Sequence, residues 1–171
     1  MLYWLSWQSL LFILMVELNL PSFEYKIKQH QGKAVIFDVL RKKNIVLTPE
    51  EWVRQHFVHY IINHLGYSKS LIKIESGLKY NTITKRSDLI AYNQDGEPVL
   101  LVECKAPHIK LTDSVIRQVA SYNKIIDASY IVMTNGLEHI CMVYNKESNQ
   151  IEYLDNIPNF TMVNIKKRST P

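Results

Sequence analysis

The stretch "TKRSDLIAYNQDGEPVLLVECK", residues 84–105, decides the fold prediction. Two apolar runs flank "NQDGE", and an Asp-Gly pair between such runs is a strong signal for a two-residue hairpin turn. With Asp95 and Gly96 as the turn, Asp88 falls directly opposite Glu103. A four-residue loop would keep both acids on one face, because side chains alternate along a strand; only an odd loop or a bulge would separate them. The hairpin therefore predicts two facing carboxylates.

These carboxylates need a compensating charge. Glu103 and Lys105 share a face because residues i and i+2 of a strand point the same way. Facing carboxylates repel and require protons, a basic neighbour or a metal ion. Lys105 supplies one positive charge, Arg86 falls opposite it, and a hard divalent cation would supply the rest. The alternative is an exposed salt-bridge cluster of the same four residues, and the hairpin alone leaves both interpretations open.

Composition indicates one globular domain. The chain has 171 residues, of which 47% are apolar and 21% charged, which is enough to bury a core. A net charge of +4 and a pI near 9.0 are compatible with a polyanionic partner. Cys104 and Cys141 fall in predicted strands and form no disulfide framework, so we expect a reducing cytoplasm. The histidines at 56, 59 and 64 lack zinc-like spacing and are interpreted as surface or partly packed residues.

The N-terminus carries no charge for 16 residues. This run is shorter than a membrane span and lacks the basic region and cleavage site of a signal peptide. We favour translation from Met15, with residues 1–14 as a non-native extension, over a membrane anchor. No membrane association is expected if residues 1–14 are not translated.

The order of elements predicts an α/β (α+β) domain. Residues 15–47 are expected to form a β-meander, residues 48–145 a core, and residues 146–171 a strand and a basic tail. The first helix is expected to begin after Thr48 and stop at Gly66. Its predicted inward stripe is Val53, Phe57, Tyr60, Ile61 and His64. The remaining elements are a strand at about 72–80, the hairpin, a helix at about 112–126, and strands "SYIVMTNG", "HICMVYN" and "IEYL".

Three polar positions on the helices are ambiguous. Glu50 falls within the inward stripe of the first helix and can pair with Arg54, whereas Glu51 is expected only to cap the helix. Gln118 and Tyr122 are spaced i and i+4 and share a face of the second helix. Gln118 lies on a packing stripe there, or it simply faces water.

Five segments resemble a known family: "TPEEWVRQHF", "RSDLIAY", "LLVECKAP", "QVASY" and "IVMTNG". Together, over about residues 23–145, they are similar to the N-terminal nuclease domain of type I restriction enzyme R subunits, within the PD-(D/E)xK nuclease superfamily. The resemblance implies a restriction-endonuclease-like core with a mixed central sheet flanked by helices. Ser87 stands where the superfamily name has proline.

The resemblance also implies roles for individual residues. Asp88, Glu103 and the backbone carbonyl of Cys104 would bind Mg²⁺, which Mn²⁺ could replace. Lys105 would orient or deprotonate the attacking water and stabilise charge on the phosphate. Beside the bound metal its pKa is expected to be lowered. Glu50 would act from the first helix, either supporting the metal ligands or binding a second metal. Gln118 and Tyr122 would orient Lys105 or contact DNA. Arg54 and Arg86 would contact DNA or support the site.

The implied function is a Mg²⁺-dependent DNA endonuclease of restriction–modification or DNA-processing type. No Walker motif is present, so the helicase motor of full R subunits is expected to be lacking. The alternative is a catalytically inactive nucleic-acid-binding or assembly module with the same fold. The expected partners are DNA, other restriction-system subunits and, as a further option, a second copy of the chain.

Overall fold

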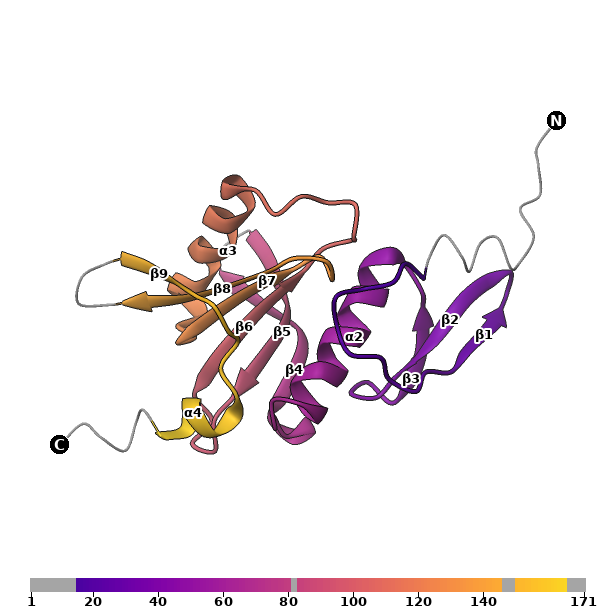
Figure 1. The fold of residues 1–171 in the computed structure, drawn as a ribbon, viewed down its shortest axis with the longest axis horizontal. Coiled ribbons are helices and arrows are strands. Elements are labelled where there is room, and N and C mark those ends of the chain that lie inside the picture. Colours follow the sequence, from indigo (N-terminus) through magenta and orange to yellow (C-terminus); the bar gives the residue numbers. More distant parts are fainter. Residues whose placement is uncertain (1–14, 81–82, 146–149, 166–171) are drawn as a thin grey trace.

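The computed structural model describes residues 15–80, 83–145 and 150–165, with the backbone alone at 75–80, 83–86, 122, 145 and 165. Its central helix, α2 (Pro49–Asn63), lies between two β-sheets (Figure 1). Thr48 caps this helix by accepting the N–H of Glu51 at 3.1 Å, and Pro49 begins it, as predicted. The mixed α+β architecture predicted from the sequence is confirmed.

The smaller sheet is the predicted antiparallel meander. It consists of β1 (Ile27–His30), β2 (Lys33–Asp38) and β3 (Lys43–Val46) in the order β1-β2-β3. Gln31 and Gly32 both have positive φ (49° and 74°), which is the conformation of the tight turns that suit hairpins. The inner face of this sheet packs Ala34 and Ile36 against Trp52 of α2.

The larger sheet contains six strands in sequential order. They are β4 (Ile72–Tyr80), β5 (Ile83–Tyr92), β6 (Pro98–Cys104), β7 (Tyr130–Thr134), β8 (His139–Asn145) and β9 (Gln150–Leu154). The pair β6–β7 is parallel, and helix α3 (Asp113–Ile126) connects those two strands; the other neighbours are antiparallel. The 3₁₀ turn η1 (Lys69–Leu71) precedes β4, and α4 (Phe160–Ile165), which the sequence did not predict, follows β9.

The charged hairpin has the predicted register but a different turn. Leu89 faces Val102 and Ile90 faces Leu101, as predicted. The turn, however, spans residues 93–97, and its N–H groups are held by Asn93, so the two-residue Asp-Gly turn is wrong. Pro98 faces Tyr92, and a bulge follows between Ala91 and Tyr92. The odd loop and the bulge each shift the register by one residue, and the two shifts cancel.

Two helices cover opposite faces of the six-stranded sheet. Alternate residues of β6 divide between them: Leu100 and Val102 pack with Phe57 of α2, and Leu101 packs with Val119 of α3. Both faces are therefore apolar, which leaves polar side chains for the strand ends.

Helix α2 is buried on nearly every side, because the meander covers the part of the helix surface that the six-stranded sheet leaves uncovered. Val53, Phe57 and Ile61 are buried as predicted, but His64 is exposed at the C-cap. His56 is buried, with its ring 4.1 Å from that of Trp52, so it is packed more deeply than predicted.

Residues 15–20 contact both α2 and the turn between β7 and β8. The carbonyl of Val16 accepts the indole N–H of Trp52 at 2.9 Å, and the N–H of Asn19 donates to Gly136 at 2.7 Å. Leu18 lies against Gly136, whose φ is 84°. The predictions for residues 1–14 lie outside the described residues. Within the described ranges, no helix is long and apolar enough to cross a membrane.

Candidate active site

The end of β6 carries an ion pair. Lys105 Nζ lies 2.7 Å from Glu103 Oε1, and both side chains are mostly shielded from solvent. Burial and the nearby charge of Asp88 raise the pKa of Glu103, and these effects outweigh the opposing influence of Lys105. The charge of Asp88, on the neighbouring strand, therefore acts on Glu103.

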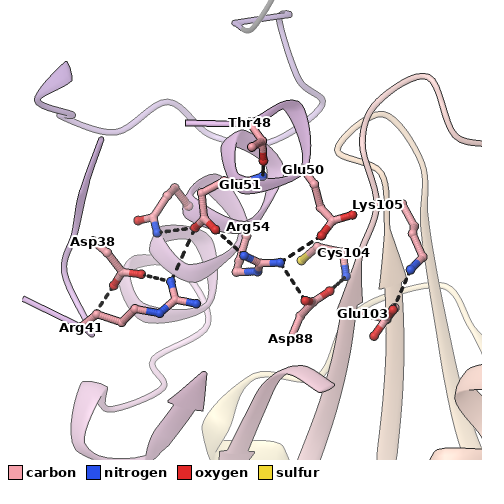
Figure 2. Close-up of polar contacts among 11 residues, drawn as sticks. Asp38, Arg41, Thr48, Glu50, Glu51, Arg54, Asp88, Glu103, Cys104 and Lys105 are labelled. Carbon is pink, nitrogen blue, oxygen red and sulfur yellow. Dashed lines mark hydrogen bonds and ion pairs between the residues drawn. The ribbon is translucent and has the colours of Figure 1, made fainter. Parts of the chain in front are cut away.

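Asp88 bridges β6 and α2 (Figure 2). Its Oδ2 accepts the backbone N–H of Cys104 at 2.7 Å, and its Oδ1 accepts a hydrogen bond from Arg54 Nη2 at 2.8 Å. The Asp88 carboxylate thus accepts the N–H of Cys104 in place of a backbone carbonyl of the neighbouring strand. Cys104 itself directs its thiol into the core, where burial raises its pKa.

Arg54 is the centre of the acidic network. Its side chain is only 7% exposed and binds Glu50 at 3.1 Å, Asp88 at 2.8 Å and Glu51. Burial disfavours the guanidinium charge, but Asp88 and Glu51 outweigh that effect and raise the pKa of Arg54. Within the described chain, Nε of Arg54 has no hydrogen-bond partner. The position of the guanidinium is therefore set by its contacts with the carboxylates and not by hydrogen bonds from all of its N–H groups.

The network continues into the meander. Glu51 Oε1 accepts from Gln55 Nε2 at 2.9 Å and lies 3.8 Å from Arg41 Nη1. Arg41 in turn binds Asp38 Oδ2 at 2.5 Å, and Asp38 is fully buried. Figure 2 shows this chain of charges running from the β2–β3 turn to the end of β6. Five carboxylates and three basic groups take part, so the network has an excess of negative charge.

Glu51 corrects a sequence-based prediction. It was expected only to cap α2, but its carboxylate is buried and binds Arg54 and Gln55. Burial raises the pKa of Glu51 despite the nearby Arg54. The i+3 and i+4 spacing of Glu51 to Arg54 and Gln55 was the available signal. Nothing in the sequence indicated Asp38 and Arg41, because their approach depends on how the meander packs.

The pKa of Lys105 is raised in the metal-free protein. Partial burial disfavours its charge, but the hydrogen bond to Glu103 and the charges of Glu103 and Asp88 outweigh it. Lys105 is therefore a cation at neutral pH in this state. The lowered pKa expected from the sequence applies to a lysine beside a bound metal, and it stays a prediction.

Of the remaining predicted site residues, only some have side chains that the structure places in the network. Glu50 joins the network through Arg54, while Gln118 is exposed on α3 and its part in the site stays a prediction. The side chains of Arg86 and Tyr122 lie outside what the structure describes.

The segment after Lys105 is held by the predicted "IVMTNG" stretch. The N–H of Lys105 donates to the carbonyl of Thr134 at 2.8 Å, and Asn135 Nδ2 donates to the carbonyl of Ile109 at 2.9 Å. The side-chain oxygen of Asn135 also accepts the N–H groups of the β7–β8 turn. These contacts fix the point at which the backbone leaves the sheet, and they thereby fix the backbone position of Lys105.

The donor set suits a hard cation. Among the described residues, no three His, Cys, Asp or Glu side chains gather closely enough to hold a metal by themselves. The predicted set needs only two carboxylates, from Asp88 and Glu103, plus a carbonyl oxygen of Cys104. All three are oxygen donors of the kind that Mg²⁺ prefers, and the surplus negative charge favours a cation. The residues present therefore fit the ion.

Fold and site together define an α+β domain with a buried acidic network at the end of a mixed sheet. Residues 49–158, well over half of the chain, match the family model of the type I restriction enzyme R protein N terminus. The chain belongs to this family, which confirms the resemblance found in the sequence.

A solved structure shows a further likeness. The chain is similar to the fragment structure of a putative HsdR subunit of a type I restriction enzyme from Vibrio vulnificus YJ016, at 16% identity and a TM-score of 0.49. The similarity covers 67% of this chain and 24% of that one, so this chain corresponds to about a quarter of that fragment. No curated protein matches the sequence.

Proposed function

We propose that this protein is a Mg²⁺-dependent DNA endonuclease of restriction–modification or DNA-processing type, with a PD-(D/E)xK core. The observation that carries the proposal is geometric: Asp88, within β5, accepts the N–H of Cys104, the residue after Glu103 near the end of β6, and Lys105 is bound to Glu103. Membership of a restriction-enzyme family supports it.

Asp88, Glu103 and the carbonyl of Cys104 would hold the metal. In an extended strand the N–H and C=O of one residue point to the same side. Because the N–H of Cys104 points at Asp88, its carbonyl is expected beside the same carboxylate. When bound, Mg²⁺ supplies a more acidic water and neutralises charge on the scissile phosphate; Mn²⁺ is expected to substitute.

The protein's own groups have separate tasks. Lys105, bound to Glu103, would orient or deprotonate the attacking water and place a positive charge beside the phosphate oxygens. Arg54 would hold the Asp88 carboxylate in position, and Glu50 would support Arg54 from the start of α2. Gln118, with Tyr122 and Arg86, would contact DNA or orient Lys105.

One observation favours the alternative, a catalytically inactive binding or assembly module. Arg54 and Lys105 already provide a cation for each of Asp88 and Glu103, so both acids are satisfied without a metal. A module of this type would bind DNA in a salt-dependent manner that EDTA does not alter.

The proposed partners follow from the proposed reaction. DNA is the substrate, other subunits of a restriction system are candidate partners, and a homodimer stays a prediction that sedimentation can test. We place the reaction in the cytoplasm.

Plasmid cleavage in Mg²⁺ or Mn²⁺, together with calorimetric titration of Mg²⁺, tests the proposal. Wild type should take up the ion and cut, whereas Asp88→Asn and Glu103→Gln should lose both properties. Lys105→Ala should take up the ion but cut at least about a hundredfold more slowly, the usual scale for a lost transition-state charge. The matched control is Asp113→Asn, an exposed acid at the start of α3.

Two results would reject the endonuclease. One is the absence of Mg²⁺ uptake by the wild-type protein. The other is residual cleavage that is equal in the wild type, Asp88→Asn and Lys105→Ala, since it would come from a contaminant. Unchanged circular dichroism must accompany each loss of activity, so that misfolding does not imitate it.

A further inference from the structure

The positive charge of the chain is concentrated in the meander. Residues 24–46 contain six basic and two acidic residues, a surplus equal to the net charge of +4 of the whole chain. The remainder of the protein is therefore neutral overall. The basic residues are Lys26, Lys28, Lys33, Arg41, Lys42 and Lys43, and the acidic ones are Glu24 and Asp38.

Strand alternation places much of this charge on one surface. The inner face of the meander carries Ala34 and Ile36, which pack on Trp52. The opposite face, which we name the outer face, consists of Lys26, Lys28, His30, Lys33, Val35, Phe37 and Val46. Its basic residues are all exposed, and Figure 1 shows the meander on the side of α2 away from the six-stranded sheet.

An aromatic ring lies among these basic side chains. Phe37 is 43% exposed on the central strand, and its N–H donates to the carbonyl of Lys26 on β1. Val46, 48% exposed, faces Val35 on the neighbouring strand. Lys28 faces Val35 from the other side, and His30 faces Lys33. Of the apolar side chains on the outer face, Phe37 and Val46 are exposed and Val35 is buried, and exposed lysines border them.

This combination suits an unpaired nucleic-acid strand. Every base has a flat face that can stack on an exposed aromatic ring, and lysines beside the ring can contact the flanking phosphates. A duplex keeps its bases stacked on one another, so it could use the lysines but not Phe37. A purely structural role would not require the phenylalanine on the exposed face of β2, because the core of the meander lies on its other side.

The outer face is also connected to the acidic network. The β2–β3 turn carries exposed Lys42 and Lys43 next to Arg41, which lies 3.8 Å from Glu51. A strand lying on the outer face can therefore follow positive charge around the turn toward α2. The meander lies outside residues 49–158, the part that matches the family model.

We propose that the outer face binds an unpaired stretch of DNA, with Phe37 stacked on a base and Lys26, Lys28 and Lys33 contacting phosphates. This inference rests on the proposed function for the choice of DNA. It adds to that function the form of the substrate and the surface that holds it.

Fluorescence anisotropy with a labelled single-stranded oligothymidylate tests the proposal, measured in EDTA so that binding is independent of cleavage. The triple variant Lys26→Gln, Lys28→Gln and Lys33→Gln should bind more weakly. Across about 50–200 mM salt, its log–log salt slope should be shallower by about 2, since each lost contact removes about 0.7. The control triple Lys69→Gln, Lys73→Gln and Lys124→Gln removes the same charge from other exposed sites and should keep the slope.

Phe37→Leu tests the stacking separately. It keeps an apolar side chain on the outer face and should weaken single-strand binding on the order of tenfold, while duplex binding stays unchanged. Tyr153→Leu, which removes an exposed ring from β9, is the control and should bind as wild type does.

Three results would overturn the proposal: equal losses in the two lysine triples, an unchanged affinity in Phe37→Leu, or a stronger preference for duplex than for single strands. Intact single-strand binding without cleavage would reject only the endonuclease. Cleavage that is normal in every outer-face variant, with normal binding, would reject only the outer-face site.

Discussion

Replacing Arg54 with methionine should strongly destabilise the protein. The guanidinium is 7% exposed, and the carboxylates of Glu51 and Asp88 that it binds are 9% and 15% exposed. Methionine has a similar length and is apolar, so the packing around α2 is largely kept. What is lost is the compensating charge for two acids that water reaches poorly.

The expected loss is about 3–5 kcal/mol, the range for removing one partner of a buried ion pair. The third partner, Glu50, adds little, because its side chain is 43% exposed and solvent screens it. For a domain with a total stability of about 5–15 kcal/mol, this is a large fraction. With a urea dependence of about 2 kcal/mol per molar, the midpoint should fall by about 2 M.

Urea unfolding followed by circular dichroism measures this shift, and three comparisons refine it. Arg54→Lys keeps the charge but not the forked donors, so its loss should be intermediate. Adding Glu51→Gln to Arg54→Met should restore part of the stability, because one uncompensated charge is removed. The loss in Arg54→Met should also be smaller at pH 5 than at pH 8, since a carboxylate without its cation is more easily protonated.

A loss below about 1 kcal/mol at pH 8, which is typical of an exposed ion pair, would refute the reasoning. So would a double variant less stable than Arg54→Met alone. Either result would mean that water reaches these acids freely.

Two further predictions concern parts of the fold outside the network. Burial lowers the pKa of His56 below its ordinary value of 6.5, so the unfolded chain takes up that proton more readily than the folded chain. Stability should therefore fall as the pH drops below about 6.5, and urea midpoints of His56→Gln should fall less. Gly136→Ala should cost about 1–3 kcal/mol, because a Cβ there meets Leu18 at 2.7 Å and φ is 84°. Gly96→Ala, with φ of 80° and nothing within 4 Å, should cost less; equal thermal shifts would contradict the Leu18 contact.

Much of the fold follows from local patterns. Thr48 and Pro49 mark the start of α2, and the apolar segment "HICMVYN" coincides with β8. Helix α4 was not predicted from its short, mixed sequence. Its position depends on tertiary contacts such as that of Phe160 with Tyr67, which no local pattern encodes.

The sequence indicated the two acids of the candidate site, Asp88 and Glu103, but not that Arg54 and Arg41 reach the acidic network. Strand alternation places Asp88 near Glu103 for any even turn, and in the structure the bulge between Ala91 and Tyr92 offsets the odd turn. The bond from Arg54 to Asp88 depends on how α2 crosses the sheet, and the approach of Arg41 depends on how the meander covers α2. The raised pKa of Lys105 comes mainly from Glu103, its neighbour along the strand, with smaller contributions from Asp88 and Glu50.

The turn at residues 93–97 and the bulge beside it have a practical consequence for engineering. Because a bulge can absorb one residue, the tip of this hairpin should accept a peptide tag or a fluorophore-bearing insertion without rotating Asp88 away from Glu103. The tip would then serve as an attachment point from which a reporter could test for the proposed metal uptake at Asp88 and Glu103.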